Sequence, residues 1–341
     1  MNSKLSLRFL CALCCLFTTS FLTSVFAQEV CKNEIGYSVN DTEKRYEIIN
    51  GTGLRAVAEM LNTGTAVYKT VYLPNGIYDL YDEERTNRTN GVTISASDVT
   101  LIGESHDARI IGLFKGIKGS TINLRGDNII VRNLSIESTV PTLRGVAPAL
   151  AASGDNIFFD KVKLIGGQDT YVGGSNKPEG CRKLFHECII VGTVDFICNG
   201  GANTLDYFLR CDLQLKEGGV IAAPQGMAYF RDCTVSDYPG YKTADNKFSL
   251  ARPWRTTGKA FFINTTFNVM PTWGFTGMGG GVFKSENAGT TGNLNVATGT
   301  LFEIVNPPQD PQPLQMSEED IKKLSSISDI CGPILATLVS E

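Results

Sequence analysis

Short runs of apolar and aromatic residues recur along the chain, and each run ends in polar residues or a cysteine. Their fifth positions lie about 22 to 32 residues apart, a period that suits one coil of a solenoid. β-branched and aromatic residues dominate the runs, and glycine-containing pairs separate them, so they predict strands joined by turns. The repeats are IIVRN at 129–133, IFFDK at 157–161, LFHEC at 184–188, YFLRC at 207–211, YFRDC at 229–233 and FFINT at 261–265.

A single coil of this kind cannot bury its own apolar row, whereas stacked coils bury their rows in one continuous core. The pattern therefore predicts a solenoid of short strands. We expect the aligned fifth positions to form an internal ladder, with Asn133, Cys188, Cys211, Cys233 and Thr265 among its members.

Two helices are expected outside the repeats. Residues 52–61 carry apolar residues at helical spacing, with Thr52 as a possible N-cap, and would cover one open end of the stack. Residues 317–324 are typical of a capped amphipathic helix with acids in its first turn, as expected for a second terminal cap. The proline-rich stretch at 307–313 is expected to be an extended connection on the surface.

The N-terminal residues have the features of a targeting segment. Lys4 and Arg8 precede an apolar run at 9–26, and a small-residue cleavage pattern ends at Ala27. This predicts a signal peptide at 1–27 and one large domain at 28–341, since no linker divides the remainder. The alternative is a membrane anchor, which the short run and its threonines and serines disfavour. We expect a secreted, extracellular protein, or a periplasmic one in a bacterium.

Charge and cysteine usage narrow the classes of partner. The formal net charge is -4 with interspersed signs, which excludes the basic stripe that nucleic acid requires. Seven cysteines remain after the predicted cleavage; Cys31 with Cys331 is one possible bridge, and Cys188 and Cys211 are expected on adjacent coils, with the pairing left open. The chain has only two histidines and no CxxC pair, so a zinc site has little support.

Three polar segments are candidates for a catalytic site: GQDTY at 167–171, GTVDFI at 192–197 and LARPW at 250–254. Asp169 and Asp195 lie about one coil apart, in apolar or small-residue surroundings that would raise or split their carboxyl pKa values. The alternative for each is a turn-capping aspartate. Arg252 and Trp254 supply a fixed cation and an aromatic plate, which suit a carboxylate and a sugar ring.

Taken in order, the three segments resemble the signature of the pectinesterase (pectin methylesterase) family. That signature consists of QDT(L/Y), GTVDFI and L(G/A)RPW motifs on a right-handed parallel β-helix. The similarity extends to GIY at 76–78, VTLIGE at 99–104 and Trp273, and so spans most of the mature chain. It implies an all-β, right-handed single-stranded parallel β-helix with short capping helices at the ends. It also implies a secreted hydrolase that removes methyl esters from pectin and needs no metal or cofactor.

The resemblance implies a catalytic role for three charged residues. Asp195 matches the nucleophile that attacks the ester carbonyl, and Arg252 would pair with it and keep it ionised. Asp169 matches the general acid and base, which would protonate the departing methanol and then activate water.

Four further residues are assigned to the site in the same way. Gln168 matches an oxyanion-hole donor for the charge that develops on the carbonyl oxygen. Trp254 would stack on the sugar, and Tyr171 and Phe196, within the two aspartate motifs, are assigned to substrate binding beside it.

The chain departs from the family pattern at several positions. A second oxyanion-hole glutamine is replaced by Val146 in VAPAL at 146–150, and valine donates no hydrogen bond. Cys198 and Asn199 change the family's DFIFG segment, and Leu80 replaces an acid. Cys198 suggests a thiol nucleophile, although a buried structural thiol is the stronger interpretation. The stretch at 176–180 either rims the groove or is a surface insertion.

Three rival functions remain. A polysaccharide lyase or galacturonan hydrolase would need clustered acids for calcium, or paired acids at a glycosidic bond, and neither arrangement is evident. A catalytically weak or silent pectin-binding protein is supported by Val146 and opposed by the retained Asp169, Asp195, Arg252 and Gln168. An esterase for a different ester is the third. We expect pectin as the partner, no nucleic acid, no membrane after cleavage, and a monomer.

Overall fold

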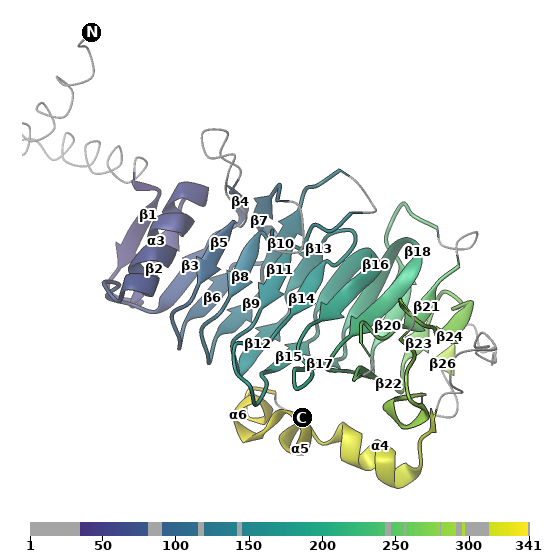
Figure 1. Ribbon diagram of the computed structural model, residues 1–341. Coiled ribbons are helices and arrows are strands. Elements are labelled where there is room, and N and C mark those ends of the chain that lie inside the picture. Colours follow the sequence, from purple (N-terminus) through teal and green to yellow (C-terminus); the bar gives the residue numbers. More distant parts are fainter. Residues whose placement is uncertain are drawn as a thin grey trace, which may run out of the picture.

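The computed structural model describes residues 35–80, 91–114, 119–141, 145–242, 247–255, 257–279, 281–290, 295–296 and 314–339. The chain winds into a solenoid of stacked parallel strands, which confirms the predicted fold class (Figure 1). Successive coils place a strand on each of three faces, because each short apolar run pairs with the equivalent run of the next coil.

The first face is a 12-stranded sheet that is parallel except at its N-terminal pair. It contains the repeats noted in the sequence. Its strands, in order, are β1 (Tyr37–Asn40), β2 (Arg45–Ile48), β3 (Thr70–Leu73), β6 (Thr100–Gly103), β9 (Ile130–Arg132), β12 (Ile157–Asp160), β15 (Arg182–His186), β17 (Leu205–Leu209), β19 (Met227–Arg231), β22 (Lys259–Ile263), β25 (Ala288–Thr290) and β27 (Leu314–Gln315).

The second and third faces belong to one 15-stranded sheet, because two long strands cross the bend between them. The second face contains β4 (Gly76–Asp79), β7 (Ala108–Gly112), β10 (Ser135–Ser138), β13 (Lys163–Ile165), β20 (Thr234–Asp237), β23 (Thr266–Phe267) and β26 (Asn295–Val296). The third contains β5 (Val92–Ile94), β8 (Ile122–Leu124), β11 (Leu150–Ala152), β14 (Tyr171–Gly173), β21 (Ser249–Ala251) and β24 (Trp273–Phe275). The crossing strands are β16 (Ile189–Asn199) and β18 (Asp212–Pro224).

A column of phenylalanine rings fills the inside of the solenoid behind the first face. Neighbouring rings stack nearly parallel, with centroids 4.3 to 4.8 Å apart, because equivalent positions on adjacent coils lie directly above one another. The column consists of Phe159, Phe185, Phe208, Phe230 and Phe262. Stacking in this register converts the sequence repeat into a continuous apolar core.

The internal ladder differs by one residue from the prediction in its first two coils. His186 pairs with Asp160, so Cys188 aligns with Val162 rather than with Lys161, and the buried ladder begins at Leu134 rather than at Asn133. Cys188, Cys211, Cys233 and Thr265 are buried as predicted. Asn133 instead lies at the preceding corner, where its φ is 52°.

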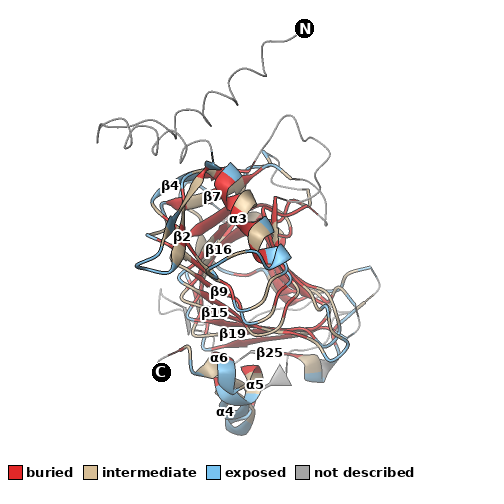
Figure 2. Cartoon of the chain, turned by 90° about the vertical axis from the view of Figure 1, so that its left-hand side faces the viewer, coloured by how far each residue is buried: buried red, intermediate tan, exposed pale blue. Residues whose placement is uncertain are grey.

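The N-terminal helix α3 (Gly51–Thr63) lies across one end of the stack, as expected (Figure 2). Its apolar stripe, which includes Leu54, Val57 and Leu61, joins the main core. The predicted N-cap is wrong by two residues: the side chain of Asn50, in extended conformation, accepts a hydrogen bond from the Gly53 amide, and Thr52 lies inside the helix.

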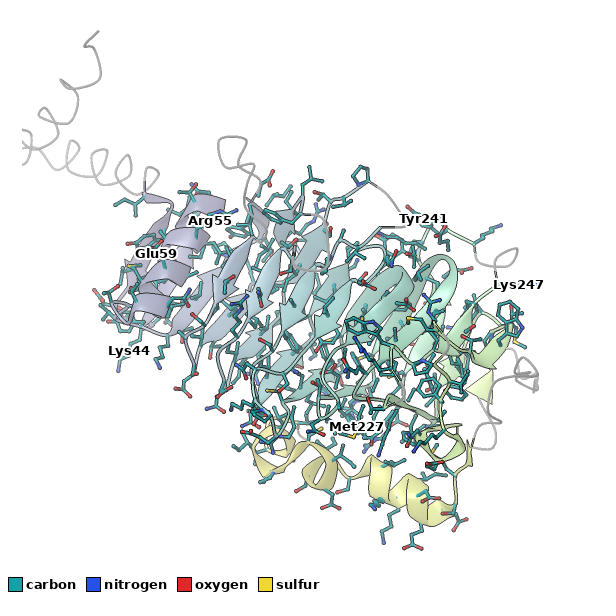
Figure 3. The ribbon with its side chains drawn as sticks, viewed as in Figure 1. Lys44, Arg55, Glu59, Met227, Tyr241 and Lys247 are labelled. Carbon is teal, nitrogen blue, oxygen red and sulfur yellow. The ribbon has the colours of Figure 1, made fainter. Side chains whose placement is uncertain are left out.

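The C-terminal helices α4 (Glu318–Ser325), α5 (Ile327–Cys331) and α6 (Pro333–Ala336) pack along the outer side of the first face (Figure 1). Ser317 caps α4 with a capping box, as predicted. The expectation that this helix covers an end is wrong, because outward side chains of the first face form a second apolar cluster that these helices cover. Met227, labelled in Figure 3, packs against this cluster.

Six cysteines are described, and all six are buried free thiols. Cys188 and Cys211 lie on adjacent coils as predicted, but they form no disulfide. Cys31, the predicted signal peptide and the stretch at 307–313 lie outside the described residues. None of the described helices is long and apolar enough to cross a membrane.

Candidate active site

The two candidate aspartates occupy the same position on neighbouring coils. Tyr171 on β14 pairs with Ile197 on β16, and each aspartate lies two residues before its member of that pair. Asp169 and Asp195 therefore both stand at the bend between the second and third faces, one coil apart as the sequence predicted. Both are buried, with only 6% of either residue exposed.

The backbone at this bend is irregular. Asp169 and Asp195 have φ values of 56° and 50°, in the left-handed region that asparagine and aspartate enter more readily than other non-glycine residues. The register of β16 against β18 shifts on both sides of Val194. The Asp169 amide donates to the Val194 carbonyl at 3.1 Å, which fixes one aspartate turn against the other. These features aim two carboxyl groups at the same corner.

Arg252 follows β21 and reaches back to Asp195. Its Nε donates to Oδ1 at 2.8 Å and its Nη2 to Oδ2 at 2.5 Å, a two-pronged pair that occupies both carboxylate oxygens. The Arg252 amide donates to the Ala222 carbonyl on β18. This hydrogen bond to the preceding coil holds the backbone that presents the guanidinium. The hydrogen bond that Arg252 donates to Asp195 raises the pKa of Arg252, so this cation persists beside the carboxylate.

Asp169 has a different electrostatic environment. Burial first, and then the negative charge of Asp195, raise its carboxyl pKa from 3.8 to about 7, while Arg252 opposes this shift. Among the described residues, its side chain has no hydrogen-bond partner. The site thus holds one carboxylate paired with a cation and one carboxyl group that keeps its proton near neutral pH.

Gln168 is partly exposed, immediately before Asp169. Within the described part of the chain its side-chain amide makes no hydrogen bond, so the amide can donate a hydrogen bond to a ligand. Val146 on the preceding coil forms a parallel bridge with Gln168, so the missing second donor would have stood beside it. The Ala147 amide donates to the Gln168 carbonyl at 3.4 Å and is therefore not an oxyanion donor.

Trp254 is half-buried beside the end of β16. Its amide donates to the Pro224 carbonyl, and a side chain at Gly200 would lie only 3.2 Å from indole Cζ3. The absence of a side chain at Gly200 lets the indole lie over the backbone here. The ring retains an exposed part, as a sugar-stacking residue requires.

The structure corrects the assignment of Tyr171 and Phe196 to substrate binding. Both side chains are fully buried in the main core. Tyr171 begins β14 two residues after Asp169, and Phe196 directly follows Asp195 on β16; both rings lie inside the solenoid. The prediction that these two residues contact the substrate is therefore wrong. The Tyr171 hydroxyl instead donates a hydrogen bond to Asp206 inside the solenoid at 3.0 Å.

Cys198 lies on β16, three residues after Asp195, and its side chain is buried. Burial and the nearby charges of Asp169 and Asp195 raise the pKa of its thiol far above the usual value. A thiol with a raised pKa stays protonated, so the structure favours the structural interpretation over a nucleophile. Leu80, in place of an acid, is also buried.

The enlarged stretch at 176–180 lies at the corner between β14 and β15. Asn176 donates to the Arg125 carbonyl, and Lys177 forms an ion pair with Asp127 at 2.8 Å. These bonds hold the stretch against the corners of earlier coils. In the described ranges, no group of three or more His, Cys, Asp or Glu side chains is placed to hold a metal ion.

Solved structures with a similar fold include pectin methylesterases. The carrot enzyme matches with a TM-score of 0.63 at 16% identity, covering 80% of this chain and 87% of its own. The enzyme from Erwinia chrysanthemi matches with a TM-score of 0.59 at 20% identity, covering 77% and 88%. At these identities the likeness concerns the fold.

Curated relatives come from Arabidopsis thaliana. Probable pectinesterase/pectinesterase inhibitor 23 is 26% identical over 245 residues, which covers 64% of this chain and 40% of the relative. Probable pectinesterase 30 is 26% identical over 204 residues, which covers 54% and 38%. The chain thus spans about two fifths of the length of these relatives. The Pectinesterase family profile matches residues 39–278, more than half of the chain, and the protein therefore belongs to the pectinesterase family.

Proposed function

We propose that this protein is a secreted hydrolase that removes methyl esters from the homogalacturonan of pectin. The observation that carries the proposal is the difference between two neighbouring carboxyl groups. Asp195 is held in a two-pronged ion pair by Arg252, and Asp169 has its pKa raised to about 7. A nucleophile and a proton donor are the two groups that ester cleavage through an acyl-enzyme needs.

In the first half of the reaction, a carboxylate oxygen of Asp195 attacks the ester carbonyl carbon. The new carbon–oxygen bond pushes negative charge onto the carbonyl oxygen, which Gln168 stabilises by hydrogen bonding. The carbonyl re-forms, the bond to the methoxy oxygen breaks, and Asp169 gives its proton to that oxygen. Methanol leaves, and the galacturonyl group remains bound to Asp195 as an anhydride.

In the second half, Asp169 is a carboxylate and accepts a proton from water. The water oxygen attacks the galacturonyl carbonyl, and the bond to Asp195 breaks. The product is a galacturonate carboxylic acid, Asp195 regains its charge beside Arg252, and Asp169 is protonated again. The net reaction consumes one water per ester and needs no metal or cofactor.

Val146 is the residue that bears most on the expected turnover rate. It stands beside Gln168, where a second amide donor would share the oxyanion charge. Loss of one such donor typically lowers turnover about 100-fold to 1000-fold. The alternative is therefore a weak or silent member that binds pectin, or an esterase for another ester. The paired Asp195 and the protonated Asp169 favour an enzyme.

Substrate contact in this proposal rests on Trp254. Trp254 is partly exposed two residues after Arg252, and its indole is suited to stacking on a galacturonate ring. Pectin is the proposed partner, and we propose that the mature chain acts as an extracellular monomer after removal of residues 1–27.

Methanol release tests the proposal. The purified mature chain should release methanol from highly methyl-esterified pectin and none from pectin that has first been saponified. Binding of esterified pectin without methanol release, by a folded protein, would replace the proposal with the silent alternative. Hydrolysis of a simple aryl ester with no action on pectin would indicate a different substrate.

A further inference from the structure

A pair of opposite charges is enclosed inside the solenoid below the active site. Lys183 on β15 and Asp206 on β17 stand opposite each other on adjacent strands, both with no exposed surface, and Nζ lies 3.8 Å from Oδ1. The equivalent inward positions on neighbouring coils are apolar, namely Ile157, Ala228 and Ala260. Desolvating two charges costs more than apolar residues would, so stability alone does not explain this pair.

The pair contacts the strand that follows Asp169. The Tyr171 hydroxyl on β14 donates to Asp206 Oδ1 at 3.0 Å, and Lys183 Nζ donates to the carbonyl of Gly174, the residue after β14. The Tyr171 ring crosses the core and meets Phe185 edge-on, with centroids 4.8 Å apart. Strand β14 is thus tied to the first face at both its start and its end.

This tie acts on a backbone segment that turns in the left-handed conformation. Asp169, two residues before Tyr171, has a φ of 56° and no side-chain hydrogen bond within the described residues. Between these two residues, Thr170 Oγ1 donates to the carbonyls of Gly167 and Val191 at 3.1 and 2.9 Å. The Asp169 carboxyl is therefore placed by anchors on the residues that follow it, Thr170 first and Tyr171 next along the strand.

We propose that Tyr171, Asp206 and Lys183 are positioning residues for the esterase site. By joining β14 to the first face across the core, they set the distance of the Asp169 carboxyl from Asp195 and Arg252. None of the three contacts the substrate. The inference rests on the proposed function. It assigns a role to two buried charges whose equivalent positions on neighbouring coils are apolar.

Two matched hydroxyl deletions test the proposal. Tyr171→Phe removes the bond to Asp206, whereas Tyr207→Phe removes a 3.0 Å bond to the Leu324 carbonyl on the outer side of the same sheet. On a methyl-esterified oligogalacturonide, kcat should fall about tenfold or more in Tyr171→Phe, with KM within about twofold, because a small misplacement of a catalytic group slows chemistry. Tyr207→Phe should keep the wild-type kcat. Equal kcat values in the two variants would overturn the proposal.

A second variant separates positioning from stability. Replacing all three residues with apolar ones, as Lys183→Met, Asp206→Leu and Tyr171→Phe together, removes both buried charges and the hydroxyl. The melting temperature should equal or exceed that of the wild type, while kcat falls as in Tyr171→Phe. A triple variant with wild-type kcat would overturn the proposal. Failure of both the single variant Tyr171→Phe and the triple variant to fold would also overturn it, because the residues would then have a structural role.

A readout without turnover keeps this inference separate from the proposed function. The titration of the Asp169 carboxyl, followed by ¹³C NMR, depends on its burial and on its distances from Asp195 and Arg252. Its midpoint should shift in Tyr171→Phe and not in Tyr207→Phe. No methanol release by the wild type would refute the proposed function alone, whereas identical midpoints in both variants would refute the positioning role.

Discussion

Several corners of the solenoid use the same left-handed backbone turn, and one of them contains the candidate active site. Between the first and second faces, six successive coils place a residue at φ of 50° to 54°, and the amides of the first five donate to a carbonyl of the next coil. These residues are Asn133, Lys161, Glu187, Arg210, Asp232 and Asn264. At the bend between the second and third faces, Asp169 and Asp195 repeat the conformation, and the Asp169 amide bonds the next coil in the same way.

The difference between the corners lies in the side chains. At the first corner they vary from Lys to Asp and reach solvent. At the bend both are aspartates, both are buried, and Arg252 pairs with one of them. The left-handed turn is therefore a property of the solenoid, and the site arises where that turn directs carboxyl groups into a low-dielectric corner.

The largest expected effect comes from replacing equivalent aspartates at the two corners with alanine, one at a time. Asp195→Ala should lower methanol release at least about 10⁴-fold, because it removes the nucleophile. Asp232→Ala, an aspartate in the same backbone conformation at the exposed corner, should leave the rate unchanged. Similar rates for the two variants would show that the bend has no special chemistry.

The next largest effect concerns the second oxyanion-hole donor, whose position is occupied by Val146. Val146→Gln places an amide beside Gln168 and should raise kcat by about tenfold or more, since one oxyanion donor is worth about 100-fold to 1000-fold. Val146→Leu is the control of similar bulk without a donor, and should not raise kcat. An unchanged rate in Val146→Gln would count against this account of the oxyanion site.

The pH dependence of kcat/KM reports the proton on Asp169. Because its pKa is about 7 and the acid form must donate to methanol, kcat/KM should fall about tenfold for each pH unit above 7. Circular dichroism over the same range checks that the protein stays folded. A rate that stays level from pH 6 to pH 9 would rule out Asp169 as the proton donor.

The smallest effect is on stability. The pKa of Asp169 rises from 3.8 to about 7 on folding, so the folded state holds the proton more tightly, and stability falls as pH rises through that range. Asp169→Asn is neutral at every pH and should gain about 1–3 kcal/mol over the wild type at pH 8, with little difference at pH 3. The pKa of the exposed Asp98, which shares the conformation, is lowered, so Asp98→Asn should not be stabilising at pH 8. Thermal unfolding at both pH values measures the contrast.

The sequence predicted the solenoid and the placement of the two candidate aspartates on neighbouring coils because their signals are local and repeated. It misplaced Asn133 and Lys161 by one residue because the first face is apolar on both sides near β12, so the usual alternation of apolar and polar positions disappears. Tyr171 and Phe196 were assigned to the groove because their motifs are functional, whereas both rings lie in the core.

Lys183 and Asp206 could not be found from the sequence. Charged residues are normally assigned to the surface, and their partnership depends on the register of two strands that are 23 residues apart. The same limit applies to the C-terminal helices. Their apolar stripes are visible in the sequence, but the sheet that they cover is identified only once the coils are stacked.

The most direct test of the central claim is to observe the intermediate on Asp195. An activated aryl ester of an oligogalacturonide acylates without help from the proton donor, so in Asp169→Asn the acyl-enzyme should accumulate. After acid quenching, peptide mass spectrometry should find one galacturonyl adduct on the peptide that contains Asp195, and none when Asp195→Ala is added. An adduct on another residue, or hydrolysis of the ester with no adduct at any time, would contradict the account.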